Sequence, residues 1–237
     1  MIFMPRSSTL RLIQFLLIFL FNYHFCNSQI YEVGVTIGGT NFIGDVGNTT
    51  FINPNESAFG GIVKWNRSPR HAYRFSFITG TISANDLDSN DPRRNERGYN
   101  FSTSLKEFST GMEFNFFDYN LHEYDVLFTP YIYSGIIYSK YENLLFNGNN
   151  LQNSGDYEWS LGIPMVLGVK YRIFEKIILS FEIGARYTFS DKIDGSQPYN
   201  ENFNFTFGNE NNNDWYMFSG FNLTYTFGRQ PCYCNIK

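Results

Sequence analysis

Two cysteines near the end of the chain are among its few side chains suited to chemistry. Cys232 and Cys234 are separated by a single residue, and Cys26 is the other cysteine of the sequence. Thiols this close could form a strained local disulfide, or one of them could bond covalently to a partner. The alternative is an incidental pair in a disordered tail, because spacing alone does not define a disulfide framework.

An acidic segment at residues 86–91 resembles the start of a calcium-binding EF-hand loop. Such a loop requires glycine at its sixth position and a closing glutamate at its twelfth. The chain has Asp91 and Arg97 at those positions, so we expect a solvated surface loop here. No metal and no other cofactor is expected.

Histidine, the commonest acid-base residue of enzymes, is scarce in this sequence. His71 and His122 are the histidines that follow the N-terminal segment, and both fall near short connections in the pattern described below. No Ser-His-Asp or His-Asp arrangement is therefore expected near the long connections, although carboxylates could act alone. We predict that the protein is not an enzyme and has no small-molecule substrate.

From Tyr31 onward the chain is a succession of aromatic-rich runs in which apolar residues alternate with small or polar ones. This period of two places successive side chains on opposite faces of a β-strand. In the run 159–171, for example, Leu161, Ile163 and Met165 share one face, whereas Ser160, Gly162 and Lys170 share the other. The other runs expected to form strands are 31–39, 58–66, 71–82, 99–116, 127–141, 177–189 and 215–227.

The connections between these runs alternate in length. Long ones are expected at 40–57, 83–98, 142–157 and 191–214, and brief ones at 67–70, 118–125 and 172–176. In a closed up-and-down barrel every second connection lies on the same rim, so one rim can carry all the long loops. The pattern predicts an all-β fold, an eight-stranded antiparallel up-and-down transmembrane β-barrel.

A soluble lipocalin-like barrel, with its apolar face inward, has the same periodicity. The last three strands favour the membrane, because their apolar faces carry no charge and their ends carry aromatic residues such as Trp159 and Trp215. The polar faces then gather charged side chains around the barrel axis. An eight-stranded barrel is narrow enough to be filled by side chains, so we expect a hydrated ion-pair network in the lumen. Its members are Glu32, Lys64, Arg74, Glu107, Glu113, Lys170, Glu182 and Arg186.

The N-terminal segment 1–28 has the features of a cleaved secretory signal peptide. Arg6 and Arg11 precede an apolar run at 12–21, which is shorter than the roughly 20 residues of a membrane-spanning helix. Residues 29–228 then form the barrel domain, and 229–237 form a tail in which Pro231 cannot continue the strand ladder. With the first strand starting at the periplasmic rim, both mature termini are periplasmic and the long loops are extracellular.

Composition and charge are consistent with one exported domain. The chain has 237 residues, a net charge of -4 and an aromatic fraction of 19%. This charge gives no basic footprint for nucleic acid. A mean hydropathy of -0.29 is not an argument against the membrane, since only alternate residues of a barrel strand meet lipid.

Several segments carry a family resemblance: YEVGV at 31–35, GGTNFIGD at 38–45, FINPN at 51–55, KWNRSPR at 64–70, EFNFFD at 113–118 and FTPY at 128–131. Together they resemble the PorG family of outer-membrane barrels, a component of the type IX secretion system. The resemblance implies a location in the outer membrane and periplasmic contact with a ring of proteins resembling PorK and PorN, which supports protein secretion and, in some members, gliding. It brings no catalytic motif and no cofactor.

These observations lead to one functional hypothesis and two alternatives. The hypothesis is a non-enzymatic outer-membrane scaffold that anchors a periplasmic secretion assembly, with Cys232 and Cys234 as candidate attachment points. The first alternative is a surface adhesin or receptor that acts through its long loops. The second is a soluble carrier of an apolar ligand.

Overall fold

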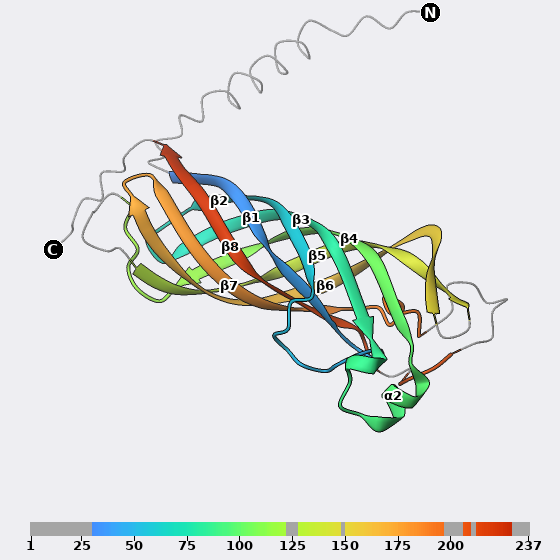
Figure 1. Ribbon diagram of the computed structural model, residues 1–237. Helices are drawn as coiled ribbons and strands as arrows, with labels where there is room; N and C mark the ends of the chain where they lie inside the picture. The colour runs from blue at the N-terminus through green and yellow to red at the C-terminus, as the bar shows by residue number, and fades with distance from the viewer. Residues whose placement is uncertain (1–29, 122–127, 148–149, 197–205, 210–211, 229–237) are drawn as a thin grey trace, which may run out of the picture.

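The chain folds into a closed antiparallel β-barrel (Figure 1). The structure, a computed structural model, describes residues 30–121, 128–147, 150–196, 206–209 and 212–228. Each strand pairs with the next along the chain, and β8 pairs with β1 to close the sheet, which confirms the predicted eight-stranded barrel. The strands are β1 (Ile30–Ile43), β2 (Glu56–Asn66), β3 (His71–Asn85), β4 (Asn100–Asn115), β5 (Phe128–Asn147), β6 (Asn150–Phe174), β7 (Ile177–Thr188) and β8 (Trp215–Gly228).

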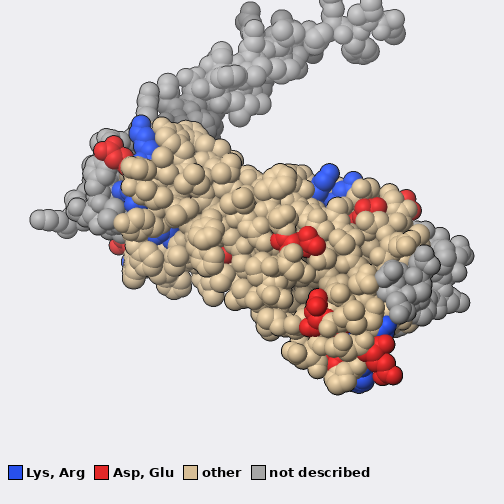
Figure 2. Space-filling model, in the orientation of Figure 1, with Lys and Arg blue, Asp and Glu red and all other residues tan. Residues whose placement is uncertain are grey.

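The polarity of the wall is that of a transmembrane barrel. On β6 the outward Leu167 is 67% exposed, whereas the inward Lys170 is 0% exposed. Figure 2 shows a broad stretch of the wall with hardly any charged side chains, which gather instead toward the two ends of the molecule. Bulky apolar side chains thus face outward and charged ones inward, so the soluble lipocalin-like alternative, which requires the reverse, is wrong.

The two rims of the barrel differ. The short-turn rim carries the connections 67–70, 116–127 and 175–176, and the chain also begins β1 and ends β8 there (Figure 1). The long-loop rim carries the connections 44–55, 86–99 and 189–214, together with the turn between β5 and β6. The predicted alternation of connection lengths therefore holds at five of the seven connections: 116–127, with twelve residues, is as long as 44–55, and the connection after β5 is the clear exception.

That exception is a strand pair where a long loop at 142–157 was expected. Strand β5 continues to Asn147 and β6 starts at Asn150, with a register irregularity between Glu142 and Leu144. The polar Asn- and Gly-rich composition suggested a loop, but Gly148-Asn149, the two residues between the paired Asn147 and Asn150, is also a sequence typical of a two-residue hairpin connection. The cross-strand ladder outweighs the weak local preference of these residues for extended structure.

The connection 86–99, also expected to be an irregular loop, contains the short helix η1 (Asp86–Asp88) and the α-helix α2 (Pro92–Arg97). Asp91 caps α2 by accepting from the backbone N–H of Arg93, Pro92 occupies the first turn, and Gly98 ends the helix at a φ of 67°. Cap, proline and glycine are all readable helix signals. No helix within the described part of the chain is long and apolar enough to cross a membrane.

A cluster of buried apolar residues fills the barrel mouth at the long-loop rim. It joins the ends of several strands to Val46 and Ile193, two residues of the long connections that are 0% exposed. The long loops are thereby anchored to the barrel. The strand residues of the cluster are Phe42, Ile82, Ala84, Phe101, Leu105, Ile137, Tyr141, Leu144, Leu151 and Tyr216.

Three sequence-based predictions fall on residues outside those described. They are the signal peptide at 1–28, the tail at 229–237 with Cys232 and Cys234, and His122 in the connection between β4 and β5.

Candidate functional site

The lumen is occupied by charged side chains, and Glu113 on β4 lies at their centre. The Glu113 carboxylate is 3.0 Å from Lys64 Nζ and 3.9 Å from Arg74 Nη1, and it also pairs with Lys170. These partners come from β2, β3 and β6, on both sides of β4. One buried carboxylate therefore links strands that are not neighbours in the sheet.

A second buried carboxylate, Glu182 on β7, binds Arg74 through two parallel hydrogen bonds. Arg74 Nη1 and Nη2 donate to the two carboxylate oxygens at 2.7 and 2.9 Å. The Tyr131 hydroxyl donates to the same carboxylate at 2.8 Å. Bidentate, charge-assisted geometry of this kind fixes both side chains and offsets part of their desolvation.

The remaining predicted lumen residues are also inside the barrel. Glu107 accepts from the Tyr216 hydroxyl at 2.6 Å and lies 3.4 Å from Arg186 Nε. Glu32 accepts from Asn66 Nδ2 at 2.9 Å and from Thr224 Oγ1 at 2.8 Å. All eight predicted residues are at most 2% exposed, so the lumen is a packed network of four acids and four bases.

Arg172 is a further buried base, and it was absent from the predicted network. It is 3% exposed, and its Nη2 donates to the Asn120 backbone carbonyl at 2.9 Å. Position 172 was expected in a turn, whereas β6 extends to Phe174 and keeps Arg172 in step with the inward Lys170. The period of two, continued by one step, could have found it.

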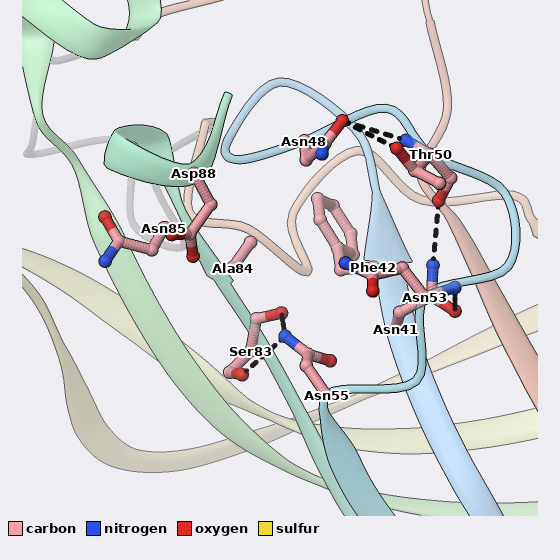
Figure 3. A pocket seen from close by; sticks show the side chains of 10 residues that line it. All are labelled: Asn41, Phe42, Asn48, Thr50, Asn53, Asn55, Ser83, Ala84, Asn85 and Asp88. Atoms are coloured by element: carbon pink, nitrogen blue, oxygen red, sulfur yellow. Dashed lines mark hydrogen bonds between the residues drawn. The ribbon is translucent and has the colours of Figure 1, made fainter. Parts of the chain in front are cut away.

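A pocket with a volume of about 290 Å³ opens at the long-loop rim (Figure 3). The end of β1, the connection 44–55, the end of β3 and η1 contribute its walls. Amide side chains predominate, and Asp88 is its one charged lining residue among those described. The lining residues are Asn41, Phe42, Asn48, Thr50, Asn53, Asn55, Ser83, Ala84, Asn85 and Asp88.

Asparagines hold the pocket walls in place. Asn41 Nδ2 donates to the carbonyls of Thr50 and Phe51, and its Oδ1 accepts from the Asn53 backbone N–H. Asn55 Nδ2 donates to both the carbonyl and the hydroxyl of Ser83 at 3.1 Å, as Figure 3 shows. The connection 44–55 is thus fastened to β1 and β3, which gives the pocket a defined shape.

The acidic segment 86–91 holds the connection 44–55 in place through Asp86. Asp86 is 0% exposed, pairs with Arg97 at 2.7 Å and accepts the backbone N–H groups of Gly47 and Tyr99. Gly47 has a φ of 84°, a conformation that favours glycine. Asp86 therefore acts as a structural anchor, and within the described residues no group of three or more His, Cys, Asp or Glu side chains is arranged to hold a metal.

Several polar groups of the pocket are available to a ligand. Among the described residues, the Asn53 and Asp88 side chains, Asn48 Nδ2 and Asn85 Nδ2 have no hydrogen-bond partner. The volume lies at the lower end of the range of about 300 to 1,000 Å³ for small-molecule pockets. Amide donors and acceptors beside one carboxylate suit a polyhydroxylated ligand better than an anion.

Near the mouth, the connection between β7 and β8 meets Asp45 in a largely buried acidic cluster, completed by Asp191, Asp194 and Asp214. Burial raises the pKa of Asp194 to about 6, with a contribution from nearby Asp45, although the Ser196 N–H hydrogen bond lowers it. Burial and the charge of Asp194 raise the pKa of Asp214 well above its usual value. Asp214 accepts the Ile193 N–H at 2.9 Å, and Asp194 accepts the Asp45 N–H at 3.0 Å, so these acids hold the loops together.

On the short-turn rim, two of the segments that carry the family resemblance lie against each other. Arg70 of the 64–70 segment pairs with Asp118 of the 113–118 segment, and Asn115 Nδ2 donates to the Pro69 carbonyl at 3.0 Å. The Asn115 N–H donates to the Arg70 carbonyl at 2.8 Å. His71 lies beside them, with its ring 5.2 Å from that of Phe114. The two segments form a single surface, termed the turn platform (67–70 and 115–119).

Comparison with known families assigns the chain to one of them. The family described as Domain of unknown function (DUF6089) matches residues 11–236. The chain belongs to this family. No curated protein matches the sequence significantly.

Solved structures with a similar shape are membrane barrels at very low sequence identity. The N-terminal β-barrel domain of Pseudomonas aeruginosa OprF is 10% identical, with a TM-score of 0.44 over 85% of this chain and 98% of that one. Ail of Yersinia pestis, in complex with a heparin analogue, is 7% identical, with a TM-score of 0.46 over 84% and 99%. A major outer membrane protein from Thermus thermophilus is 11% identical, with a TM-score of 0.44 over 85% and 100%.

Proposed function

We propose that this protein is a non-enzymatic barrel of the outer membrane that anchors a periplasmic assembly of the type IX secretion machinery. The observation that carries the proposal is the filled lumen, whose side chains are buried and paired with one another. A barrel with such an interior acts through its rims and its outer wall, since its axis offers no path for a solute. The secretion role comes from the resemblance to the PorG family.

The turn platform is the proposed contact surface. The segments 64–70 and 113–118 belong to the resemblance and are held together at this rim by Arg70, Asp118 and Asn115. The start of β1 and the C-terminal end of β8 lie at the same rim, and the Cys232/Cys234 tail follows β8 in the sequence. The proposed orientation places this rim in the periplasm, where ring proteins resembling PorK and PorN would meet it.

Co-purification from native membranes tests the proposal. Full-length protein carrying Arg67→Glu and Arg70→Glu should lose its periplasmic partner, and the cells should lose type IX secretion. Heat-modifiable mobility in electrophoresis should remain, because both side chains lie outside the barrel wall. The matched control is Arg93→Glu on α2 at the opposite rim, which should retain both partner and secretion. If the Arg67/Arg70 variant kept both its partner and secretion, the turn platform would not be the contact surface.

A Cys232→Ser/Cys234→Ser variant tests the tail separately. If either thiol attaches covalently to the assembly, non-reducing electrophoresis of native membranes should show a higher-mass adduct that the variant lacks. Identical mobility of the two proteins would assign the tail no covalent role.

The rim pocket favours a second candidate function, a surface receptor. Its free amide groups and its single carboxylate suit a neutral, hydroxyl-rich ligand such as a saccharide. Glycan-array binding by the folded protein, weakened by Asn53→Ala and Asp88→Ala, would support the receptor. Neither of these side chains holds any part of the fold among the described residues, so the double variant should still fold. Unchanged glycan binding in the double variant would remove the pocket from consideration.

A further inference from the structure

Two lysines mark the place where the apolar outer face of β4 and β5 ends. Lys106 on β4 is directly opposite Lys140 on β5, and the preceding outward pair is Phe108 opposite Tyr138. Farther toward the short-turn rim the outward residues are uncharged. In order, they are Thr110, Met112, Phe114 and Phe116 after Phe108, and Ile136, Ser134, Ile132, Pro130 and Phe128 beyond Tyr138.

Like charges in directly opposite positions of an antiparallel pair destabilise it unless a counter-charge lies between them. Within the described part of the chain, neither lysine has an ion-pair partner. The adjacent carboxylates are engaged elsewhere, because Glu142 accepts the Gly155 N–H at 3.1 Å and Glu158 lies 3.3 Å from Lys192 Nζ. The counter-charge is thus absent from the described residues around this pair.

Aromatic neighbours of Lys140 place this level of the wall among the lipid headgroups. Lys140 Nζ lies 4.4 Å from the Tyr157 ring centroid and 5.5 Å from that of Trp159. Trp159 stacks on Tyr138 with centroids 4.4 Å apart and an interplanar angle of 11°. Trp and Tyr concentrate at the two interfaces of a membrane, where a lysine ammonium can also reach water and phosphate.

A shallow groove begins directly below the pair on the lipid-facing wall. Its volume is about 590 Å³, and Phe108 and Tyr138, the row adjacent to the lysines, form its upper end. Gly61 contributes to its floor, because a Cβ built there would meet nothing closer than the Gly34 carbonyl at 3.7 Å. The groove is mostly apolar; its other lining residues are Val33, Gly34, Ile62, Val63, Phe75, Ser76, Phe77, Ser109, Thr110 and Ile136.

We propose that Lys106 and Lys140 bind the phosphate group of a membrane lipid whose acyl chain occupies the Gly61 groove. A phosphate between the two ammonium groups would accept charge-assisted hydrogen bonds from both and remove their mutual repulsion. The apolar groove gives the hydrocarbon of the same molecule a fitted surface. A free anion would use the lysines but gain nothing from the groove. This proposal is independent of the secretion role.

Native mass spectrometry of the full-length protein in detergent tests the site with three probes: phosphorylated lipid A, dephosphorylated lipid A and inorganic phosphate. We expect phosphorylated lipid A to bind best. Lys106→Gln/Lys140→Gln should weaken its binding on the order of tenfold or more, since two charge-assisted contacts are lost. Lys106→Arg/Lys140→Arg should restore most of it. Lys176→Gln is the matched control, because Lys176 is exposed at the opposite rim and should not change binding.

The groove has a variant of its own. Gly61→Ile places a side chain in the groove, and its Cβ would come no closer than an ordinary contact of 3.7 Å with the Gly34 carbonyl, so the barrel should keep its heat-modifiable mobility while lipid binding falls. If inorganic phosphate bound as strongly as the lipid, and Gly61→Ile left that binding unchanged, the ligand would be free phosphate and the lipid proposal would be wrong. Equal retention of phosphorylated lipid A by the wild type, the lysine double variant and Lys176→Gln would overturn the site itself.

Discussion

The charged side chains of this barrel differ in energetic weight according to where they lie. Arg74 and Glu182 are 1% and 0% exposed, so each has lost its hydration and depends on the other. Arg70 and Asp118 at the turn platform are 46% and 69% exposed and keep most of their hydration. An Arg–carboxylate pair therefore contributes very different amounts to the free energy of unfolding at the two positions.

Glu182→Gln should lower the free energy of unfolding by about 3 to 5 kcal/mol, because it leaves the Arg74 guanidinium buried without its bidentate partner. Asp118→Asn, the exposed counterpart, should lower it by about 1 kcal/mol or less. Urea titration in lipid vesicles, followed by tryptophan fluorescence, measures both. Equal effects of the two substitutions would contradict the distinction between buried and exposed pairs.

The acids of the β7–β8 connection should make the long-loop rim sensitive to pH. The folded-state pKa of Asp194, about 6, lies above its ordinary value, and that of Asp214 is raised as well. A raised pKa contributes stability that is present at low pH and is lost as pH rises through the folded value. We expect amide hydrogen exchange in 189–196, corrected for the intrinsic rate, to be on the order of tenfold slower at pH 5 than at pH 8.

Asp194→Asn/Asp214→Asn serves as the control for that experiment, since the amides imitate the protonated acids. This variant should show strong protection at both pH values. Raised pKa values require the protection of these amides from exchange to decrease as pH rises. An increase with pH in the wild type would contradict them.

Among the strands, β4 and β5 approach each other closely at a pair of opposed glycines, Gly111 and Gly135. A Cβ added to Gly135 would overlap the Thr110 carbonyl oxygen and lie 2.5 Å from the Gly111 Cα. These neighbours are backbone atoms, so the strands themselves would have to move apart. Position 135 therefore has room for glycine, which lacks a Cβ, and for no larger residue.

Gly135→Val should accordingly destabilise the barrel by about 2 kcal/mol or more, the cost typical of overpacking a closed contact. Gly61→Val, on the outer wall, has open space for its side chain and should change stability by less than about 1 kcal/mol. The two variants are compared by urea titration in the same vesicles. A Gly135 variant as stable as the Gly61 variant would show that β4 and β5 separate at little cost.

The strands and the inward positions of their charged residues were predictable because both depend on a period of two, which is a local property. Two features were missed: the hairpin of β5 and β6, and the inward position of Arg172. In both places the strands continue beyond the residues that alternate regularly between apolar and polar. The rim pocket and the acidic cluster could not be read from the sequence at all. Asn55 meets Ser83, and Asp45 meets Asp194, only through loop contacts between distant segments.

At the scale of the whole molecule, the barrel is a closed ring without a free edge, and charged and aromatic side chains fill its interior. Closure pairs the ladder groups of every strand, as a bilayer requires. Tyr131, Tyr133 and Tyr216 join the ion pairs in filling the interior and are at most 2% exposed. Because the interior is filled, the outer wall and the two rims are the surfaces through which this barrel can bind other molecules.

The purified protein should therefore form no steady ion channel in planar lipid bilayers, because buried ion pairs block the axis. It should nevertheless migrate faster in unheated than in heated electrophoresis samples, since the closed barrel stays compact until heat opens it. Current recordings on the wild-type protein measure the first property. Reproducible single-channel steps would contradict a filled lumen.

The distance in sequence between the partners of the lumen network has a consequence for how the protein enters a bilayer. Arg74 meets Glu182 across 108 residues, and Glu32 meets Thr224 across 192. Hydrocarbon would surround an unneutralised charge on any of the charged strands, β1 to β4, β6 and β7, that arrived ahead of its partner. Membrane insertion should for this reason be concerted with circularisation, so that early hairpins stay at the water boundary until β7 brings Glu182 and Arg186 and β8 closes the ring.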